Sequence, residues 1–513
     1  MRGFGTQQPL HTERMHRFAA GALVFFTSAA VLVLEILAAR LLAPYVGVTL
    51  ETYTAIIGTI LAAIAIGTYV GGRLADRFNP RQMLGPTLIL GGALALFIVP
   101  IVRIVGSYNL GHGPEAVLTL AFIGFFAPAA VLSAVPPTVV KLALLDLNKT
   151  GSTVGRLSAL GTTGAIFGTF ATGFILVAAL PTTPIILTVS ALLIGAGIVT
   201  VIFLKQSASP PLTGPLAITI ILLAPLAAGA YAFERNHDPC DVESTYFCAS
   251  VVKDAVSCQD GLTLMLDTLR HSCVHPGNPT RLDFPYARTI ADVIAAAEPA
   301  GRPLTVLHIG GGGFTLPRYL EAVRPGSQSV VLELDKTLVD IAREQLGLRT
   351  SDALQVHVGD ARVGILGQPS DTFDVVIGDA FGGLAVPWHL ATREFIEQVD
   401  RVLTPTGVYV ANVIDYPPLG FVRAEAATFN SVFQHVAVIG SPAKLAGQAG
   451  GNFILVGSAE PIDEARIIEI SEARGDEFRA VMGADLDAFI GDGRMLTDDY
   501  APVDQLLTVP AFQ

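Results

Sequence analysis

Charged side chains are scarce in this chain. Only 15% of its residues are charged and 51% are hydrophobic, a balance that excludes an ordinary soluble enzyme over the whole length. Residues 1–233 hold 12 basic and 6 acidic side chains, which leaves 20 basic and 38 acidic, of the chain's 32 and 44, for the remainder. A C-terminal part so short of basic residues argues against nucleic acid as a partner, because phosphate binding needs clustered Lys and Arg. Its acidity suits either solubility alone or a cationic small ligand.

Cysteine is absent from the first 239 residues. All four cysteines follow within one short segment, as Cys240, Cys248, Cys258 and Cys273. They form no CxxC pairs, so we expect no zinc and no other bound metal. Unrelated thiols are one interpretation, but the clustering favours one or two disulfides in an oxidising compartment, with three pairings open if all four join.

Long apolar runs dominate the N-terminal half. Seven are long enough to cross a bilayer, at about 18–43, 52–72, 83–103, 115–140, 157–180, 183–204 and 214–233. The first is too long, and lacks a convincing small-residue cleavage site, for a removed signal peptide. We therefore predict an α-helical membrane bundle of about seven spans over residues 1–235, with the lipid bilayer as its partner.

Basic residues in the short loops predict the orientation of this bundle. They gather before the first span and after the second, fourth and sixth, at Arg2, Arg14, Arg17, Arg73, Arg77, Arg81, Lys141, Lys149, Arg156 and Lys205. By the positive-inside rule the N-terminus is cytoplasmic, and seven spans then place the C-terminal part outside. We expect a multi-pass protein of the cell membrane with an extracytoplasmic C-terminal domain, in agreement with the cysteine pattern.

Small residues recur inside two of the spans. Gly67 and Gly71, and likewise Gly164 and Gly168, are four residues apart, a spacing that lets helices approach closely. Pro136–Pro137 predicts a kink or an end in the fourth span.

One carboxylate, Glu35, lies well inside the first span, where charge is expensive unless it is paired or wetted. It could pair with Arg40 or mark a polar pathway.

A glycine run carries the strongest signal of the C-terminal half. The apolar stretch 304–309 ends in Gly310–Gly313, and Glu333 closes the next apolar run about twenty residues on. Glycines let a backbone approach a nucleoside, and a carboxylate at the end of the second strand accepts hydrogen bonds from ribose hydroxyls. With GDA at 359–361 and FDVVIGD at 373–379, the order predicts a nucleoside-binding α/β domain.

Two regions make up the predicted soluble part. Residues 240–300 form a small β-region, with TYFCASVV and LTLMLDTL as strands, CQDG as their connection and a helix at 287–297. Residues 301–513 form a Rossmann-like domain, because helices alternate with strands at 304–309, 329–334, 354–358, 373–378 and 407–413.

The motif order GGGG, LELD, GDA, FDVVIGD resembles the spermidine synthase (polyamine aminopropyltransferase) family, a branch of the AdoMet-methyltransferase-like fold. ESTY at 243–246, LMLD at 264–267 and FPY at 284–286 are similar to that family's N-terminal β-hairpin region. LTDDYAPVD at 496–504 is similar to the closing motif of membrane-fused members. The resemblance covers roughly 240–510 and implies a transferase of polyamine biosynthesis, homo-oligomeric like its relatives.

The resemblance also assigns roles on the nucleoside side of the site. It implies that Gly310, Gly311 and Gly312 approach the nucleoside, that Glu333 binds ribose, and that Asp360 and Ala361 flank adenine. No cofactor would be tightly bound. The cosubstrate would be decarboxylated S-adenosylmethionine, and methylthioadenosine would be a product.

On the reacting side, Asp379 matches the family's general base, which takes a proton from the attacking amine. Tyr246 and Tyr286 would hold the cationic aminopropyl chain by cation–π contact, unless they serve in core packing.

Several amine-holding groups of the family are missing. Gly313 replaces the aspartate of GGGDG, Gly382 the second aspartate of DSSDP, and Ala287 the polar residue after the hairpin tyrosine. Three residues could substitute: Asp267, His271 and Asp283.

These departures leave three functions open. The first is a membrane-anchored aminopropyltransferase acting on putrescine or a similar amine. The second is an AdoMet-dependent transferase with another acceptor. The third is a transporter or sensor of polyamines or nucleosides.

Overall fold

The chain folds into two compact units, Met1–Pro239 and Cys240–Gln513. The structure, a computed structural model, describes residues 17–47, 50–108, 114–144, 149–204, 226–233, 237–254 and 256–508.

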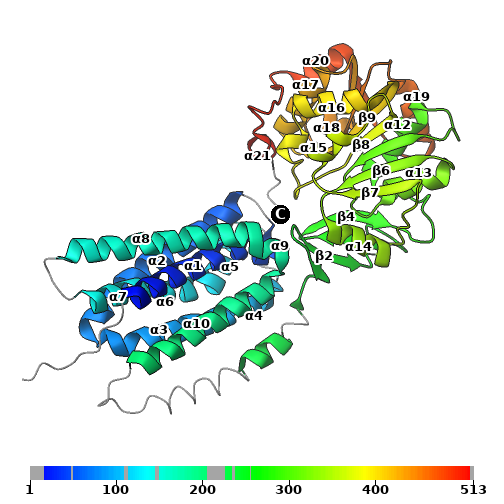
Figure 1. Cartoon of the computed structure of the whole chain (residues 1–513). Helices are drawn as coiled ribbons and strands as arrows, with labels where there is room; N and C mark the ends of the chain where they lie inside the picture. The colour runs from blue at the N-terminus through cyan, green and yellow to red at the C-terminus, as the bar shows by residue number, and fades with distance from the viewer. Residues whose placement is uncertain are drawn as a thin grey trace, which may run out of the picture. The chain divides into compact units, whose positions relative to one another are not determined.

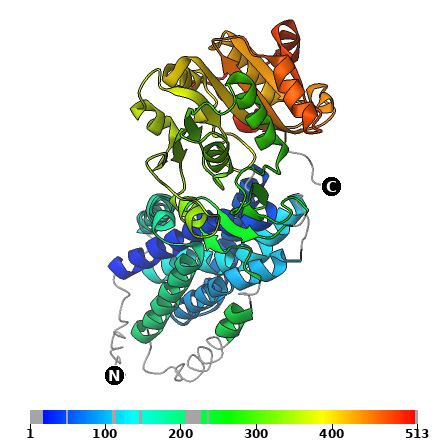
Figure 2. The ribbon, with the colours of Figure 1, turned by 90° about the vertical axis from the view of Figure 1, so that its right-hand side faces the viewer.

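Apolar helices make up the N-terminal unit (Figures 1 and 2). In the described part of this unit six stretches are long and apolar enough to cross a membrane: Phe18–Val46, Thr52–Arg77, Pro80–Gly106, Glu115–Ala143, Thr150–Ala179 and Thr182–Leu204. The predicted seventh span, 214–233, falls mostly outside the described residues, although 226–233 are helical. The first six predicted spans are thus confirmed as helices.

The helices of this unit are α1 (Arg17–Val46), α2 (Leu50–Arg77), α3 (Pro80–Leu96), α4 (Ile98–Gly106), α5 (Pro114–Ala121), α6 (Ala127–Ser133), α7 (Val135–Ala143), α8 (Thr150–Ala171), α9 (Val177–Ala179) and α10 (Thr182–Leu204). The fourth span is interrupted between α6 and α7, where Pro136 lies in the first turn of the new helix. This confirms the predicted break, because proline has no N–H for the preceding turn.

Both glycine pairs lie at close helix contacts. A Cβ at Gly164 would lie 2.2 Å from the carbonyl oxygen of Phe25, on α1, which runs beside α8. A Cβ at Gly67 would lie 2.0 Å from the carbonyl oxygen of Ala130, where α2 meets α6. The predicted small-residue packing is confirmed at both contacts.

Of the two alternatives for Glu35, the pair with Arg40 is not formed. The Arg40 Nε donates a hydrogen bond to Thr182 Oγ1 at 3.3 Å, and no ion pair joins Arg40 to Glu35 among the described residues. The side chain of Glu35 is half-buried on α1.

The C-terminal unit begins with a small antiparallel sheet. Its strands, in spatial order, are β1 (Val242–Glu243), β2 (Cys248–Val252), β3 (Leu262–Leu266) and β4 (Leu269–Val274). The stretch LTLMLDTL is therefore not one strand, as predicted, but turns at Asp267, which adopts a left-handed φ of 51°. Aspartate tolerates this conformation better than most residues, so a β-rich pattern conceals a tight turn.

Two disulfides fasten this region. Cys240 is bonded to Cys248 and Cys258 to Cys273, with Cα–Cα distances of 5.2 and 5.5 Å. The predicted disulfides are confirmed, and the pairing follows chain order.

An eight-stranded mixed sheet forms the centre of the C-terminal unit, in the order β12-β10-β11-β9-β8-β5-β6-β7. Strands β5 to β9 run parallel and the last three run antiparallel to their neighbours. Their bounds are β5 (Thr305–Ile309), β6 (Gln328–Glu333), β7 (Leu354–Val358), β8 (Phe373–Gly378), β9 (Leu403–Asp415), β10 (His435–Gly440), β11 (Gly451–Ser458) and β12 (Arg479–Met482). Because β5 pairs with both β6 and β8, the chain reverses its winding direction there, where ligands of such sheets bind.

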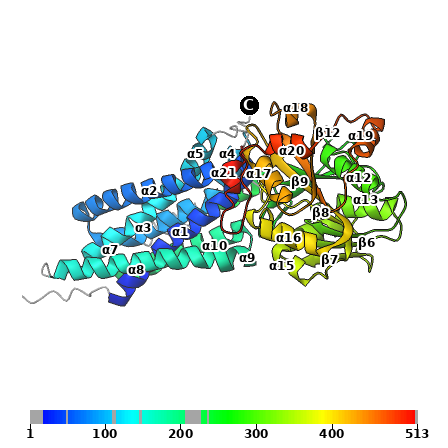
Figure 3. The same ribbon diagram turned by 90° about the horizontal axis from the view of Figure 1, so that it is seen from above.

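Helices cover both faces of this sheet (Figures 1 and 3). Buried side chains of α16 and α17 pack on one face, and those of α12, α13 and α19 pack on the other. The helices of this unit include α12 (Pro285–Ala297), α13 (Thr315–Val323), α14 (Lys336–Glu344), α15 (Ala361–Gly364), α16 (Arg393–Val402), α17 (Gly420–Asn430) and α19 (Glu464–Ala473). The result is the predicted Rossmann-like fold, with a core on each face.

Candidate active site

Four expected site residues follow four neighbouring parallel strands. Gly310 follows β5, Glu333 ends β6, Asp360 comes two residues after β7, and Asp379 directly follows β8. Because the carboxyl ends of parallel strands meet at one edge of the sheet, the topology brings these residues to the same crevice.

The glycine loop requires glycine at specific positions. Gly310 and Gly312 adopt φ values of +92° and +50°, which disfavour other residues. A Cβ at Gly310 would also lie 2.3 Å from the carbonyl oxygen of Asp379. The loop therefore touches the end of β8, and no larger residue fits at this contact.

Glu333 holds the glycine loop in place. Its Oε2 accepts hydrogen bonds from the backbone N–H groups of Gly311 and Gly312, at 2.8 and 3.1 Å. Its Oε1 accepts one from Asp335 N at 2.9 Å. Burial raises the pKa of Glu333, although the three backbone donors oppose this by favouring the carboxylate. An oxygen with one donor keeps a lone pair for a ribose hydroxyl.

Asp360 caps the short helix α15. Its Oδ1 accepts from Arg362 N at 2.8 Å, and its Oδ2 lies 3.3 Å from His389 Nε2. The carboxylate is exposed, whereas Ala361 is buried beside it. Such an arrangement leaves a hydrogen-bond acceptor at the rim and a small apolar surface next to it.

The two tyrosines expected at the amine lie in different places. Tyr246 is 48% exposed, and its pKa is raised by partial burial and by the charges of Asp335 and Asp360. The hydroxyl of Tyr286 instead makes a hydrogen bond with Asp379. The pKa of Tyr286 is raised, mainly by burial and secondly by the negative charge of Asp379. Only Tyr286 thus contacts the expected base.

Asp379 lies in an environment that suits a proton acceptor. Burial raises its pKa to about 6, and hydrogen bonds from Asn412 and Tyr286 limit the rise. The Nδ2 of Asn412, on β9, donates to Asp379 Oδ1 at 2.9 Å. A carboxyl group with a pKa close to neutrality exchanges protons effectively at physiological pH.

Two residues of this crevice escape sequence reasoning. Asn412 is 3% exposed, and its Oδ1 accepts from Asn452 Nδ2 at 3.0 Å, so a chain of amides fixes the orientation of Asp379. Asp335 is 3% exposed, and its Oδ2 has no hydrogen-bond partner among the described residues. Asn412 could have been found from the sequence as the lone asparagine of the apolar run VYVANVID.

The two positions where the family's carboxylates are missing differ in the space available for a side chain. A Cβ at Gly313 would lie 2.7 Å from the Cβ of Ser272 on β4, and the N–H of Gly313 donates to Ser272 Oγ at 3.0 Å. A Cβ at Gly382 would meet no atom within 4 Å. The close approach of β4 excludes a side chain at the first position, whereas the second is open.

Of the three suggested substitutes, only His271 lies at the glycine loop. Its ring would be 2.8 Å from a Cβ at Gly312, and burial lowers its pKa to about 4, which keeps it neutral. Asp267 accepts from Cys248 N in the β3–β4 turn. Asp283 is engaged by His275 and Arg281, each at 2.8 Å.

The closing motif supports the side of the crevice where adenine is expected. Asp498 accepts hydrogen bonds from Arg362 Nη2 and from Thr392 Oγ1, at 2.5 and 2.7 Å. The same arginine donates to the carbonyl oxygen of His389 at 2.9 Å. The motif thereby fixes the start of α15, where Asp360 lies.

Fold and site together define a Rossmann-like α/β domain whose glycine loop touches the backbone of Asp379, a residue with a buried carboxyl group. Residues 283–419 match the model of the spermine/spermidine synthase domain, and the C-terminal unit thus carries such a domain. The resemblance to the spermidine synthase family is confirmed.

Known proteins of two kinds are similar to this chain. A polyamine aminopropyltransferase of Vibrio vulnificus is 36% identical over 156 residues, which are 30% of this chain and 50% of that protein. The human eEF1A lysine and N-terminal methyltransferase is 28% identical over 123 residues, 22% of this chain and 18% of that protein. A solved structure of a probable spermidine synthase from Corynebacterium glutamicum shares 30% identity, with 52% of this chain and 98% of that chain covered and a TM-score of 0.46. The chain spans half the length, or less, of these two curated relatives.

Proposed function

We propose that the protein is a membrane-anchored aminopropyltransferase. It would move an aminopropyl group from decarboxylated S-adenosylmethionine to putrescine or a similar amine. One observation carries the proposal: Asp379, whose carboxyl group has a pKa raised to about 6, lies with its backbone carbonyl against Gly310 of the glycine loop. The matched domain and the Vibrio vulnificus relative support the same reaction.

The nucleoside would bind along the ends of β5, β6 and β7. Gly310–Gly312 would approach it with their backbone, Glu333 would accept from ribose, and Asp360 and Ala361 would flank adenine. The unpartnered Oδ2 of Asp335 supplies a further acceptor at this edge. These roles use carboxylates that the fold already holds in place by backbone donors.

The transfer needs one proton acceptor and one leaving group. An ammonium has no lone pair, so the amine must give a proton to Asp379 before its nitrogen attacks the carbon next to the sulfonium. A C–N bond then forms and the C–S bond breaks, and the electron pair of the C–S bond stays on the sulfur, which becomes the neutral thioether of methylthioadenosine. Tyr286 and Asn412 would orient the carboxylate for the proton transfer.

The loop charges and the two disulfides support an extracytoplasmic position for this domain. A donor made in the cytoplasm would then have to reach an external site, and the apolar unit is the part of the chain that could deliver it. A homo-oligomer stays a prediction.

A second candidate is methyl transfer from S-adenosylmethionine to another acceptor. Two observations favour it: glycines occupy positions 313 and 382, and a methyltransferase is among the similar proteins. Acceptor recognition is the part of the reaction that the missing carboxylates would change first.

Turnover by the full chain in detergent separates these reactions. We expect methylthioadenosine release from decarboxylated S-adenosylmethionine and putrescine, and its loss in Asp379→Asn. Asp352→Asn, at an exposed site before β7, is the matched control and should keep full activity. Release of S-adenosylhomocysteine from the undecarboxylated donor would support the second candidate, and binding of neither donor in calorimetry would exclude both.

A further inference from the structure

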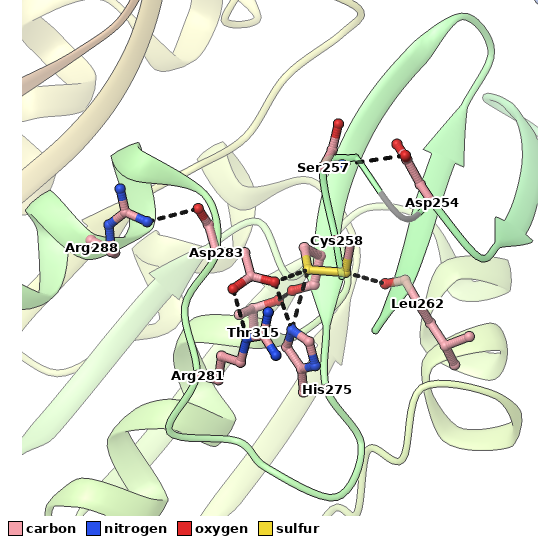
Figure 4. Close-up of polar contacts among 10 residues, drawn as sticks. Asp254, Ser257, Cys258, Leu262, His275, Arg281, Asp283, Arg288 and Thr315 are labelled. Carbon is pink, nitrogen blue, oxygen red and sulfur yellow. Dashed lines mark hydrogen bonds and ion pairs between the residues drawn. A yellow bond between two sulfur atoms is a disulfide. The ribbon is translucent and has the colours of Figure 1, made fainter. Parts of the chain in front are cut away.

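Four potential metal ligands converge at the base of the small sheet (Figure 4). Cys258, Cys273, His275 and Asp283 each bring one ligand atom, and these atoms all lie within 4.8 Å of one another. The first three residues are buried, and the side chain of Asp283 is 18% exposed. A buried set of two sulfurs, one imidazole and one carboxylate is a donor set that zinc prefers.

Three of these atoms already lie near the spacing of a tetrahedral site. Cys273 Sγ lies 3.6 Å from His275 Nε2 and 3.3 Å from Asp283 Oδ2, and the last two atoms are 2.8 Å apart. Zinc bonds of about 2.0–2.3 Å would place neighbouring donors roughly 3.3–3.8 Å apart. Two of these three separations fall in that range and the third is shorter, while Cys258 Sγ, now bonded to Cys273 Sγ, would move away from it on reduction.

In the disulfide state, most atoms of the cluster carry lone pairs, and few protons are available to form hydrogen bonds between them. Neither sulfur of Cys258–Cys273 carries a proton, yet Cys273 Sγ faces a carboxylate oxygen and Cys258 Sγ faces the carbonyl oxygen of Leu262 at 3.5 Å. The imidazole of His275 is the one group among the four ligands that can supply a proton. Reduction would add two thiolate ligands to the imidazole and the carboxylate oxygen, and a cation would then satisfy all four.

Neighbouring residues support the cluster as a built site. Arg281 Nε donates to Asp283 Oδ1 at 2.8 Å and leaves Oδ2 directed at the cluster, while Arg288 Nη1 donates to the Asp283 carbonyl oxygen at 3.0 Å. A Cβ at Gly261 would lie 2.5 Å from Cys258 Sγ and 2.7 Å from His275 Cε1. Glycine at 261 therefore provides the space that the ligands occupy.

We propose that Cys258, Cys273, His275 and Asp283 form a zinc site that is available only when the Cys258–Cys273 disulfide is reduced. Two equivalents of a small thiol convert the disulfide to two cysteine thiols and are themselves joined as a disulfide. Zinc then binds as both thiols lose their protons to solvent, so the disulfide and the metal exclude each other. No CxxC spacing marks the site, because its ligands come from a loop, from β4 and from the segment before α12.

The site is coupled to the glycine loop through β4. The carbonyl oxygen of Cys273 accepts from Thr315 Oγ1 at 3.1 Å, and Ser272 Oγ accepts from Gly313 N at 3.0 Å. Disulfide and metal are thus two means of holding this strand against the nucleoside crevice. The proposal goes beyond the transfer reaction and does not depend on it.

Cobalt binding tests the proposal, since cobalt replaces zinc in such sites and reports its ligands by absorbance. The full chain in detergent, reduced by a phosphine under anaerobic conditions, is titrated with Co²⁺ and then with Zn²⁺ against a coloured chelator. We expect one equivalent bound, a thiolate-to-cobalt charge-transfer band and tetrahedral d–d bands, all absent before reduction.

Variants assign the ligands. The double variant Cys240→Ser/Cys248→Ser removes the other disulfide and should keep the cobalt spectrum, whereas Cys258→Ser/Cys273→Ser should lose it. His275→Ala retains both disulfides for folding and should lower metal affinity at least about tenfold after reduction. The proposal is overturned if the reduced chain gives no thiolate–cobalt band, or if the band persists without Cys258 and Cys273.

Discussion

The two halves of the candidate site are built differently. On the nucleoside side, Glu333 and Asp360 stand at strand ends and are fixed by backbone donors of the loops that they serve. On the proposed acceptor side, glycine occupies positions 313 and 382, and the N–H of Gly313 donates to Ser272 Oγ. Strand ends come together by topology, whereas acceptor groups extend from loops that can change without disturbing the sheet. The nucleoside half is therefore the part that identifies the domain, and the acceptor half is the part that decides its reaction.

The largest effect should come from the residue between the two halves. Asp379→Asn should lower turnover by about 10²–10⁴-fold, because the amide cannot accept the proton of the amine. Methylthioadenosine affinity, measured by calorimetry, should stay unchanged, since the nucleoside half is untouched. Equal loss of binding and turnover would show that Asp379 holds the fold of the crevice and is not the base.

A pair of glycine substitutions tests whether the nucleoside half depends on its backbone. Gly310→Ala should abolish methylthioadenosine binding and lower the melting temperature, because its Cβ would meet the Asp379 carbonyl oxygen and its left-handed φ adds about 1–3 kcal/mol of strain. Gly382→Ala, with nothing within 4 Å of its Cβ, should leave both quantities unchanged. Similar behaviour of the two variants would contradict the assignment of the glycine loop.

Restoring a carboxylate tests where the acceptor amine binds. Gly382→Asp should lower KM for putrescine by about tenfold, as expected for one added charged hydrogen bond. Gly313→Asp should instead destabilise the domain, because its side chain would meet Ser272. If Gly382→Asp leaves KM unchanged while kcat for putrescine is normal, the acceptor does not bind along this loop.

Sequence reasoning predicted the strand ends well and the lateral contacts poorly. The order of apolar runs and carboxylates gave β5, β6 and β8 within a residue or two, because each is a buried run with a site residue at its end. It did not give Asn412, which acts across the sheet from β9, nor the contact that excludes a side chain at Gly313. Those depend on the register of distant strands, which no local pattern records. The turn at Asp267 was missed because it interrupts a mainly apolar run that contains no Gly, Pro or Asn.

The smallest effect concerns the pH at which the base becomes active. The proposed mechanism needs the carboxylate form of Asp379, so kcat/KM should fall as pH drops through its pKa of about 6. The hydrogen bond from Tyr286 favours that carboxylate, so Tyr286→Phe should raise the pKa and move the limb of the profile to higher pH by roughly 0.5–1 unit.

Tyr246→Phe is the matched control for this shift. The pKa of Tyr246 responds to Asp335 and Asp360, whereas Tyr286 responds to Asp379, so the control should leave the limb in place and alter nucleoside affinity at most. A shift in both variants would mean that several groups of the crevice together set the acidic limb of the pH profile. A shift in Tyr286→Phe alone would assign it to the carboxyl group at which the nucleoside and acceptor halves meet.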